Sequence, residues 1–509
     1  MSKVIVVLND VKLKLTLTEE LLDKSIAEAV IAPFLGAYNK KKSEFLSVER
    51  ILGFTVDDGS ELSDLTMTSR AVLTSSELPM VTLHAPPSAP SPIGVLVEGI
   101  LKASADEDAE EWREALHTLR VAVMDEAAKP TGEALPWPKA LFETPMVELA
   151  AHHACLSASA RAKRREWGAD SAEAALLLLA LLRAEQQKTG AAMCSRDVQA
   201  ADGVVLALAE PQKLNLPQLR QLSQIAFHLS LLPTEMKECA GALKDSARVA
   251  LGWVVSAITG PVDHDPVLVA GSASDLFRTL FNLVRTQPPD PKNETAVNEC
   301  GVLMSLVCDV LRARPKATPA VPELLEAQLA SLQIPVVLPE DIGYKALAKE
   351  WDSILHLLEP LLHTVEYENQ NLDAPVVPMV VLQKIAEASA KAQSEMKQHI
   401  FGEEILAKQI DKADPYRPLG ESKDWDPNLT LPKDAPLRHH LLKLLTASHY
   451  ILKRVGGDFL FAVCDDNAEE FVRITGLGGA AGLLQERNLF AAFQHMTTSA
   501  ASAAEVLEK

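Results

Sequence analysis

Glycines with the spacing of a dinucleotide-binding turn occur near the C-terminus, in Gly476-Leu-Gly-Gly-Ala-Ala481. In nucleotide-binding folds such glycines let the backbone approach a pyrophosphate at the start of a helix. That chemistry also needs a second strand-helix unit and an acidic residue about twenty positions further on, which binds the ribose. Too few residues follow Ala481 to supply them. We therefore interpret the glycines as a tight turn that starts a helix at Ala480, and we expect no cofactor.

Histidine and cysteine, which bind metals and act in catalysis, also lack a productive spacing. The adjacent pairs His152-His153 and His439-His440 point to different sides of a helix and cannot chelate one ion together. The 6 cysteines are scattered without a C-x-x-C pair, which predicts reduced, buried thiols and no zinc site. There is no phosphate-binding loop, and spacing alone supports no Ser/His/Asp arrangement. The sequence thus indicates a binding protein rather than an enzyme.

The elements that must position any binding residues are predominantly helical. The chain has 509 residues, more than one hydrophobic core normally serves, so several domains or a repeat array are expected. Hydrophobic residues make up 48% and aromatic residues only 5%, which is typical of many amphipathic helices. The net charge of −20 opposes binding to nucleic acid or to anionic lipid. No apolar stretch is long enough to span a membrane, so we expect a soluble cytoplasmic protein.

Residues 1–84 differ from the rest and predict a small α+β domain. The expected elements are a hairpin of Val4–Leu8 and Val11–Leu17, a helix from Thr18 to Ala37, a strand at Glu49–Phe54, and a last strand near Ala71–Leu73 or Val81–Leu83. Pro33 should bend or end the helix. This order and the turn Asp58-Gly-Ser-Glu-Leu-Ser-Asp64 resemble ubiquitin, although a generic α+β cap fits as well. We interpret the domain as a docking module for an unknown partner.

A Pro/Ser-rich linker, 85–97, separates this domain from a helical region over 98–509. The helices run for two to four turns and break at Pro-rich joints such as Gln287–Pro291. We expect helices at Ala109–Met124, Ala172–Gln187, Leu216–Leu231, Ser274–Val284, Gly301–Leu311, Trp351–Leu362, Val377–Lys391, Leu437–Leu445 and Tyr450–Cys464. Asp411–Pro436 is predicted to be a long loop. Repeated helices over such a length predict an armadillo- or HEAT-like superhelix.

One segment of this region, Phe459–Leu484, closely resembles a segment of the synembryn family, which are chaperones and exchange factors for heterotrimeric G-protein alpha subunits. The similarity extends back through Leu437–Thr446 and Tyr450–Phe461, a helix pair that leads into Phe-Leu-Phe. Ser274–Val284 resembles a Leu-Phe-Asn helix of the family, and Pro375–Lys391 the helix that precedes its C-terminal repeats.

The resemblance implies an armadillo-like superhelix whose concave face holds the C-terminal helix of a G-protein alpha subunit. Withdrawing that helix loosens the nucleotide pocket, which implies a folding chaperone that can also release GDP. Family members continue past this motif with an acidic tail and a further helix, whereas this chain ends at Lys509. We therefore expect binding and chaperoning first, and nucleotide exchange only as a further activity without covalent catalysis.

Helix-in-groove recognition needs an apolar trough and cations that meet the acidic groups of the ligand. The resemblance implies that Arg438 faces the groove, while His439 and His440 stand where the family tends to have Asn and Lys. Lys443, Lys453 and Arg454 complete a cationic cluster, for which a solvated helix face is the alternative. Asn282 either bonds the ligand backbone or is buried and satisfied. The predicted partner-binding residues are Arg438, His440, Lys443, Lys453, Arg454 and Asn282.

A second function fits the same architecture. An armadillo-type scaffold could bind another client, such as a cytoskeletal or ciliary protein, while the ubiquitin-like domain docks a second partner. Binding to the C-terminal peptide of a G-protein alpha subunit discriminates between the two hypotheses.

Overall fold

The chain forms two compact units, Met1–Gly203 and Val204–Lys509, in the computed structural model. The boundary proposed from sequence at residues 85–97 lies almost entirely outside the described residues and stays a prediction. The structure describes residues 2–8, 11–35, 37, 53–56, 61–62, 64, 66–69, 73, 80–84, 96–97, 100, 109–127, 139–142, 146–147, 150–151, 154, 169–184, 186–195, 199–261, 264–314, 322–368, 372–407 and 436–489.

The N-terminal part of the first unit is a five-stranded sheet with strand order β2-β1-β5-β3-β4. Its strands are β1 (Ser2–Leu8), β2 (Val11–Leu17), β3 (Gly53–Val56), β4 (Glu61–Leu62) and β5 (Met80–His84). The first two form the expected antiparallel hairpin, and β1 also pairs in parallel with β5. The expected helix follows the hairpin as α1 (Glu19–Leu22), capped by Thr18, and η1 (Ala27–Ile31), a π-helical turn.

Side chains alternate between the two faces of each strand, and those on one face form the core of this domain. Val4, Val6 and Leu8 of β1 face Val30 and Phe34 of the helical segment, and all are buried. The π-helical turn ends two residues before Pro33, whose ring cannot accommodate a regular helical bond to the preceding turn, and helical residues continue to Leu35. A small α+β domain at the N-terminus is thus confirmed, while its likeness to ubiquitin stays a prediction.

Two long helices dominate the rest of the first unit. Its described helices are α5 (Ala109–Ala127), α6 (Lys139–Phe142), α9 (Ala169–Ala184) and α10 (Gln186–Cys194). The first of these packs along α9, whose leucines are almost all buried. The expected helices over 109–124 and 172–187 are therefore present.

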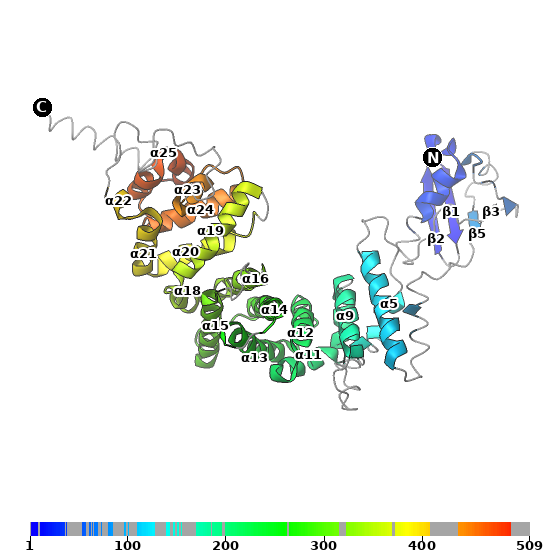
Figure 1. Cartoon of the computed structure of the whole chain (residues 1–509). Coiled ribbons are helices and arrows are strands. Elements are labelled where there is room, and N and C mark those ends of the chain that lie inside the picture. The colour runs from blue at the N-terminus through cyan, green and yellow to red at the C-terminus, as the bar shows by residue number, and fades with distance from the viewer. Residues whose placement is uncertain are drawn as a thin grey trace. The chain divides into compact units, whose positions relative to one another are not determined.

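The regular elements that the structure describes in the second unit are all helices, the first of which begins in the last residues of the first unit (Figure 1). Its elements are α11 (Ala200–Leu208), η3 (Pro211–Lys213), α12 (Leu216–Ser230), α13 (Ala240–Thr259), α14 (Pro266–Thr286), α15 (Glu294–Arg312), α16 (Pro322–Ser331), α17 (Ile334–Val337), α18 (Glu340–Leu347), α19 (Trp351–Glu368), α20 (Val376–Ala388), α21 (Ala390–Phe401), α22 (Glu403–Leu406), α23 (Leu437–Leu444), α24 (Tyr450–Val463) and α25 (Ala468–Glu486). The predicted helical body is confirmed.

Successive helices pack in layers, as expected for helical repeats. One layer contains α12, α14 and α16 side by side, and α13 packs against both α14 and α15. Among the described helices, α14 is long and apolar enough to cross a membrane, but 78% of its apolar window is buried by its neighbours. It is longer than the helix expected at 274–284, because Asp265 caps its first turn and Pro266 begins it.

The glycine-containing segment of α25 differs in part from the expectation. Gly476 leaves the helical conformation with φ 74° and ψ 153°, which confirms a sharp turn at a glycine. The helix resumes directly after Gly476 rather than at Ala480, and Phe471–Thr475 is helical. These residues therefore do not form the strand-turn-helix unit that holds a dinucleotide. The loop expected at 411–436 lies outside the described residues, apart from Pro436.

Candidate partner-binding surface

Close packing of three helices positions the predicted cationic residues. A Cβ atom at Gly456 of α24 would lie 3.0 Å from Leu444 Cδ1 and 3.2 Å from Leu444 Cβ, at the end of α23. A Cβ atom at Gly479 of α25 would lie 3.1 Å from Leu445 Cδ1. Glycines at these positions cost helix propensity, and the close approach of neighbouring helices is the compensating gain. The helices α23, α24 and α25 thus form one tightly packed group.

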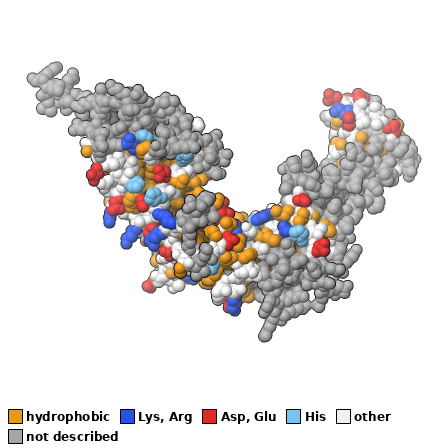
Figure 2. All heavy atoms as spheres, viewed as in Figure 1, with side chains coloured by type: hydrophobic (Ala, Val, Ile, Leu, Met, Phe, Trp, Pro, Cys, Tyr) orange, Lys and Arg blue, Asp and Glu red, His pale blue; other side chains and the backbone are white. Residues whose placement is uncertain are grey.

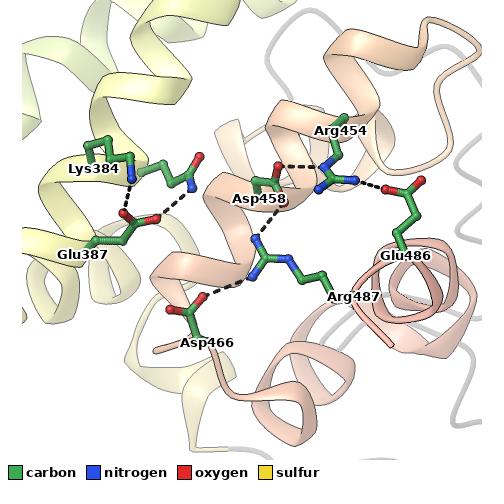
Figure 3. A network of polar contacts seen from close by, with 8 residues as sticks. Lys384, Glu387, Arg454, Asp458, Asp466, Glu486 and Arg487 are labelled. Atoms are coloured by element: carbon green, nitrogen blue, oxygen red, sulfur yellow. Dashed lines mark hydrogen bonds and ion pairs between the residues drawn. The ribbon is translucent and has the colours of Figure 1, made fainter. Parts of the chain in front are cut away.

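Ion pairs join α24 to the end of α25 (Figure 3). Arg454 donates from Nε to Asp458 Oδ2 at 2.9 Å and from Nη1 to Glu486. Arg487 donates to Asp458 Oδ1 at 2.8 Å, and its guanidinium lies 4.4 Å from the centre of the Phe461 ring. The hydrogen bond to Asp458 raises the pKa of Arg454 above its ordinary value. Asp458 therefore bridges two arginines from different helices.

A small surface pocket lies beside these ion pairs. Its volume is about 70 Å³, and it is lined by Leu445, Tyr450, Lys453, Arg454, Gly457, Gly479, Leu483 and Glu486. This is below the roughly 300–1,000 Å³ of drug-sized ligand sites, so the pocket fits a single side chain. Tyr450 is 65% exposed and Ile451 is 49% exposed in the first turn of α24. Figure 2 shows that hydrophobic side chains lie among charged ones elsewhere on the helical part as well.

The predicted residues of α23 occupy different environments. Arg438 and Lys443 are half-buried, and Arg438 Nη2 lies 3.3 Å from His439 Nε2. His440 is only 4% exposed, and its ring packs edge-on against the ring of His363 of α19, with the two ring centres 6.0 Å apart. Adjacent histidines on a helix point in different directions, and here the second one turns into the helix packing. Burial leaves little of His440 accessible to a partner, and its contact with one stays a prediction.

Asn282 belongs to another part of the second unit. Its side-chain amide donates to Ser230 Oγ of α12 at 2.9 Å, and the residue is buried between α12 and α14. Of the two interpretations given to Asn282, its position matches the buried and satisfied one. The structure thus brings Lys453 and Arg454 together at one pocket, with Lys443 on the adjacent helix α23, and Asn282 in a separate helix contact.

A second ionic cluster fastens α21 to α25. Glu470 accepts from Arg473 Nε at 2.6 Å and lies 2.6 Å from Lys397 Nζ. The hydrogen bond from Arg473 is the main cause that lowers the pKa of Glu470 to about 2. Cys464, at the end of α24, is fully buried, and burial raises its pKa to about 12. It is therefore a protonated core thiol.

The residues that sequence reasoning missed are Tyr450, Ile451 and Glu486. Glu486 lies in the last helical turn of α25, where the helix dipole disfavours an anion. An acidic residue at that position indicates that a cationic side chain of another helix pairs with it. Where the structure describes the chain, no three His, Cys, Asp or Glu side chains are arranged to hold a metal ion.

The region that carries this surface is similar to known proteins. Residues 156–508 match the family model described as guanine nucleotide exchange factor synembryn. Two relatives, chaperone Ric-8A of Mus musculus and chaperone Ric-8A of Xenopus laevis, are each 44% identical to this chain over 55 residues. These residues cover 11% of this chain and 10% of each relative. Chaperone Ric-8A of Gallus gallus is 42% identical over 55 residues with the same coverage. The chain thus matches about a tenth of the length of these curated relatives.

Proposed function

The chain belongs to the family described as guanine nucleotide exchange factor synembryn, and from this premise we propose that it binds a G-protein alpha subunit. In this proposal it acts in the cytoplasm as a folding chaperone of that subunit, through the concave face of its helical body. The matched relatives are themselves named chaperones. Guanine nucleotide exchange is proposed as a further consequence of binding.

The observation that carries the proposal is the surface of α24 within the family-matched region. Exposed Tyr450 lies beside Lys453 and Arg454 at a pocket that accepts one side chain, and exposed Ile451 follows Tyr450 in the same helical turn. Apolar anchors next to cations are what recognition of an amphipathic helix with acidic groups requires. We propose the C-terminal helix of the alpha subunit as that ligand, with Arg438 and Lys443 contributing from α23.

Such binding accounts for both proposed activities without covalent chemistry. Holding the C-terminal helix of an alpha subunit away from its nucleotide site would loosen GDP. The same contact would cover an apolar helix face while the nascent subunit folds. Because each effect depends on preferential binding of one conformation, its size is limited by the difference in affinity for the two conformations.

A pull-down with the C-terminal peptide of a G-protein alpha subunit tests the proposal. The wild-type chain should retain the peptide, and Arg438→Glu should weaken retention by adding an anion. Lys391→Glu is the control, because Lys391 is 86% exposed on α21 and, among the described residues, pairs with Glu395 one turn away. GDP release from a purified alpha subunit then measures exchange separately from binding.

A scaffold for another client remains the second candidate. It is favoured by the N-terminal sheet, which lies outside the family-matched residues 156–508 and offers a separate docking module. Failure of the wild-type chain to retain the alpha-subunit peptide at low salt would favour this alternative.

A further inference from the structure

The two carboxylates that pair with Arg454 differ in how firmly they are held. Asp458 is 17% exposed and is bound by Arg487 as well as by Arg454. Glu486 is 41% exposed, and Arg454 is the cation that it pairs with in the described structure. The Asp458 contact therefore anchors the arginine, whereas the Glu486 contact is a surface ion pair at the rim of the pocket.

The Glu486 contact is also weak on energetic grounds. Exposed ion pairs contribute little because water screens them and because two flexible side chains must be ordered. The C-terminal position of Glu486 in α25 is unfavourable for an anion, since the helix dipole is negative there. A second carboxylate could therefore replace Glu486 on Arg454 without disturbing the pair that Asp458 forms with Arg487.

The residues around Arg454 determine which ligand could replace Glu486. Leu445 and Leu483 supply apolar walls of the pocket, and Gly457 and Gly479 line it without side chains of their own. Lys453 is exposed at the same rim, and within the described part of the chain it forms no ion pair. Among the residues that line the pocket, Lys453 and Arg454 outnumber Glu486 by one charge, and Asp458 outside the lining is shared between Arg454 and Arg487, in a chain whose net charge is −20. The site is thus a local cationic exception that favours an acidic ligand.

We infer that this pocket binds an acidic partner helix that presents one apolar side chain and one carboxylate, and that Glu486 is a built-in competitor for that carboxylate. The apolar side chain enters between Leu445 and Leu483, while the partner carboxylate takes the place of Glu486 on Arg454 and also pairs with Lys453. The inference rests on the proposed function, because it specifies the chemistry of the partner segment. It also sets the specificity of the site, since a neutral or basic helix cannot displace Glu486.

A synthetic amphipathic helix tests the inference independently of any G protein. The peptide carries Leu and Glu four residues apart on one face, and its Glu→Gln version is the ligand control. Fluorescence anisotropy with the full chain measures affinity. Glu486→Gln should bind the acidic peptide about two- to five-fold more tightly than the wild type, as expected from removal of one competing surface ion pair. Lys453→Glu should weaken binding, and the Glu→Gln peptide should bind weakly to every variant.

Glu469→Gln is the matched control, since it makes the same charge change at an exposed residue in the first turn of α25. It should bind the peptide as the wild type does, and circular dichroism should show that all variants fold alike. Equal or weaker binding by Glu486→Gln, or no binding by any variant, overturns the inference. Because the probe is a peptide, that failure is distinct from a failure to bind an alpha subunit.

Discussion

Alanine at two neighbouring glycines should change stability in opposite directions. Gly456 and Gly457 both lie inside α24, so alanine at either position gains about 1 kcal/mol of helix propensity. At Gly457 the new methyl group would meet Leu445 and Leu483 side-chain atoms at 3.6 Å, which is ordinary contact. Gly457→Ala should therefore be more stable than the wild type by about 0.5–1 kcal/mol.

At Gly456 the methyl group would meet the Leu444 Cβ atom at 3.2 Å and its Cδ1 atom at 3.0 Å. The Cδ1 atom can rotate away, but the Cβ atom is fixed to the backbone of α23 and can move only with that helix. Overpacking of this kind costs about 1–3 kcal/mol, which cancels or exceeds the propensity gain. Gly456→Ala should thus be less stable than the wild type by up to about 2 kcal/mol.

Thermal unfolding followed by circular dichroism measures the difference. The midpoint of Gly457→Ala should lie a few degrees above that of Gly456→Ala, with the wild type between them. Each variant is the control for the other, because both make the same chemical change in one helix. Two variants with equal midpoints would refute the close approach of α23 and α24, and with it the positions given to Lys443 and Lys453.

Three further perturbations follow from the described contacts. Glu470→Gln removes the charge that pairs with Arg473 and should lower the free energy of unfolding by about 1–2 kcal/mol at neutral pH. Because the pKa of Glu470 is lowered to about 2, the difference from the wild type should shrink as the pH falls below about 4 towards 2. Urea unfolding at several pH values measures it. Ser230→Ala leaves the buried amide of Asn282 without its acceptor and should cost about 1–3 kcal/mol in the same assay. Cys464, whose pKa is raised to about 12, should resist alkylation at neutral pH until the chain unfolds, which mass spectrometry can follow; rapid labelling of the native protein would contradict its burial.

Local signals in the sequence predicted several helices of the second unit, among them α12, α15, α19 and α24. Asn215 precedes α12, and its side chain forms a reciprocal cap with Gln218, so both the start and the register could be inferred. The start of α14 was missed although Asp265-Pro266 is a recognisable cap signal. The helical state of Phe471–Thr475 was harder to predict, because β-branched residues next to glycines favour a strand or a turn in isolation.

The candidate site was predicted only in part, because its geometry depends on contacts between distant residues. Lys453 and Arg454 could be found from their charge, within a segment that resembles the family. Their environments could not, since Arg454 pairs with Glu486 across 32 positions of sequence. The orientation of His440 towards His363 likewise follows from how α23 packs on α19, and no local pattern distinguishes it from His439.

Equilibrium binding of a purified, GDP-bound G-protein alpha subunit is the most direct test of the central claim, which is that the α23–α25 surface receives this partner. We expect saturable binding by the wild-type chain, a several-fold loss of affinity for Lys453→Glu, and no change for Lys391→Glu. The absence of binding by the wild type, or equal affinities for all three proteins, would contradict it.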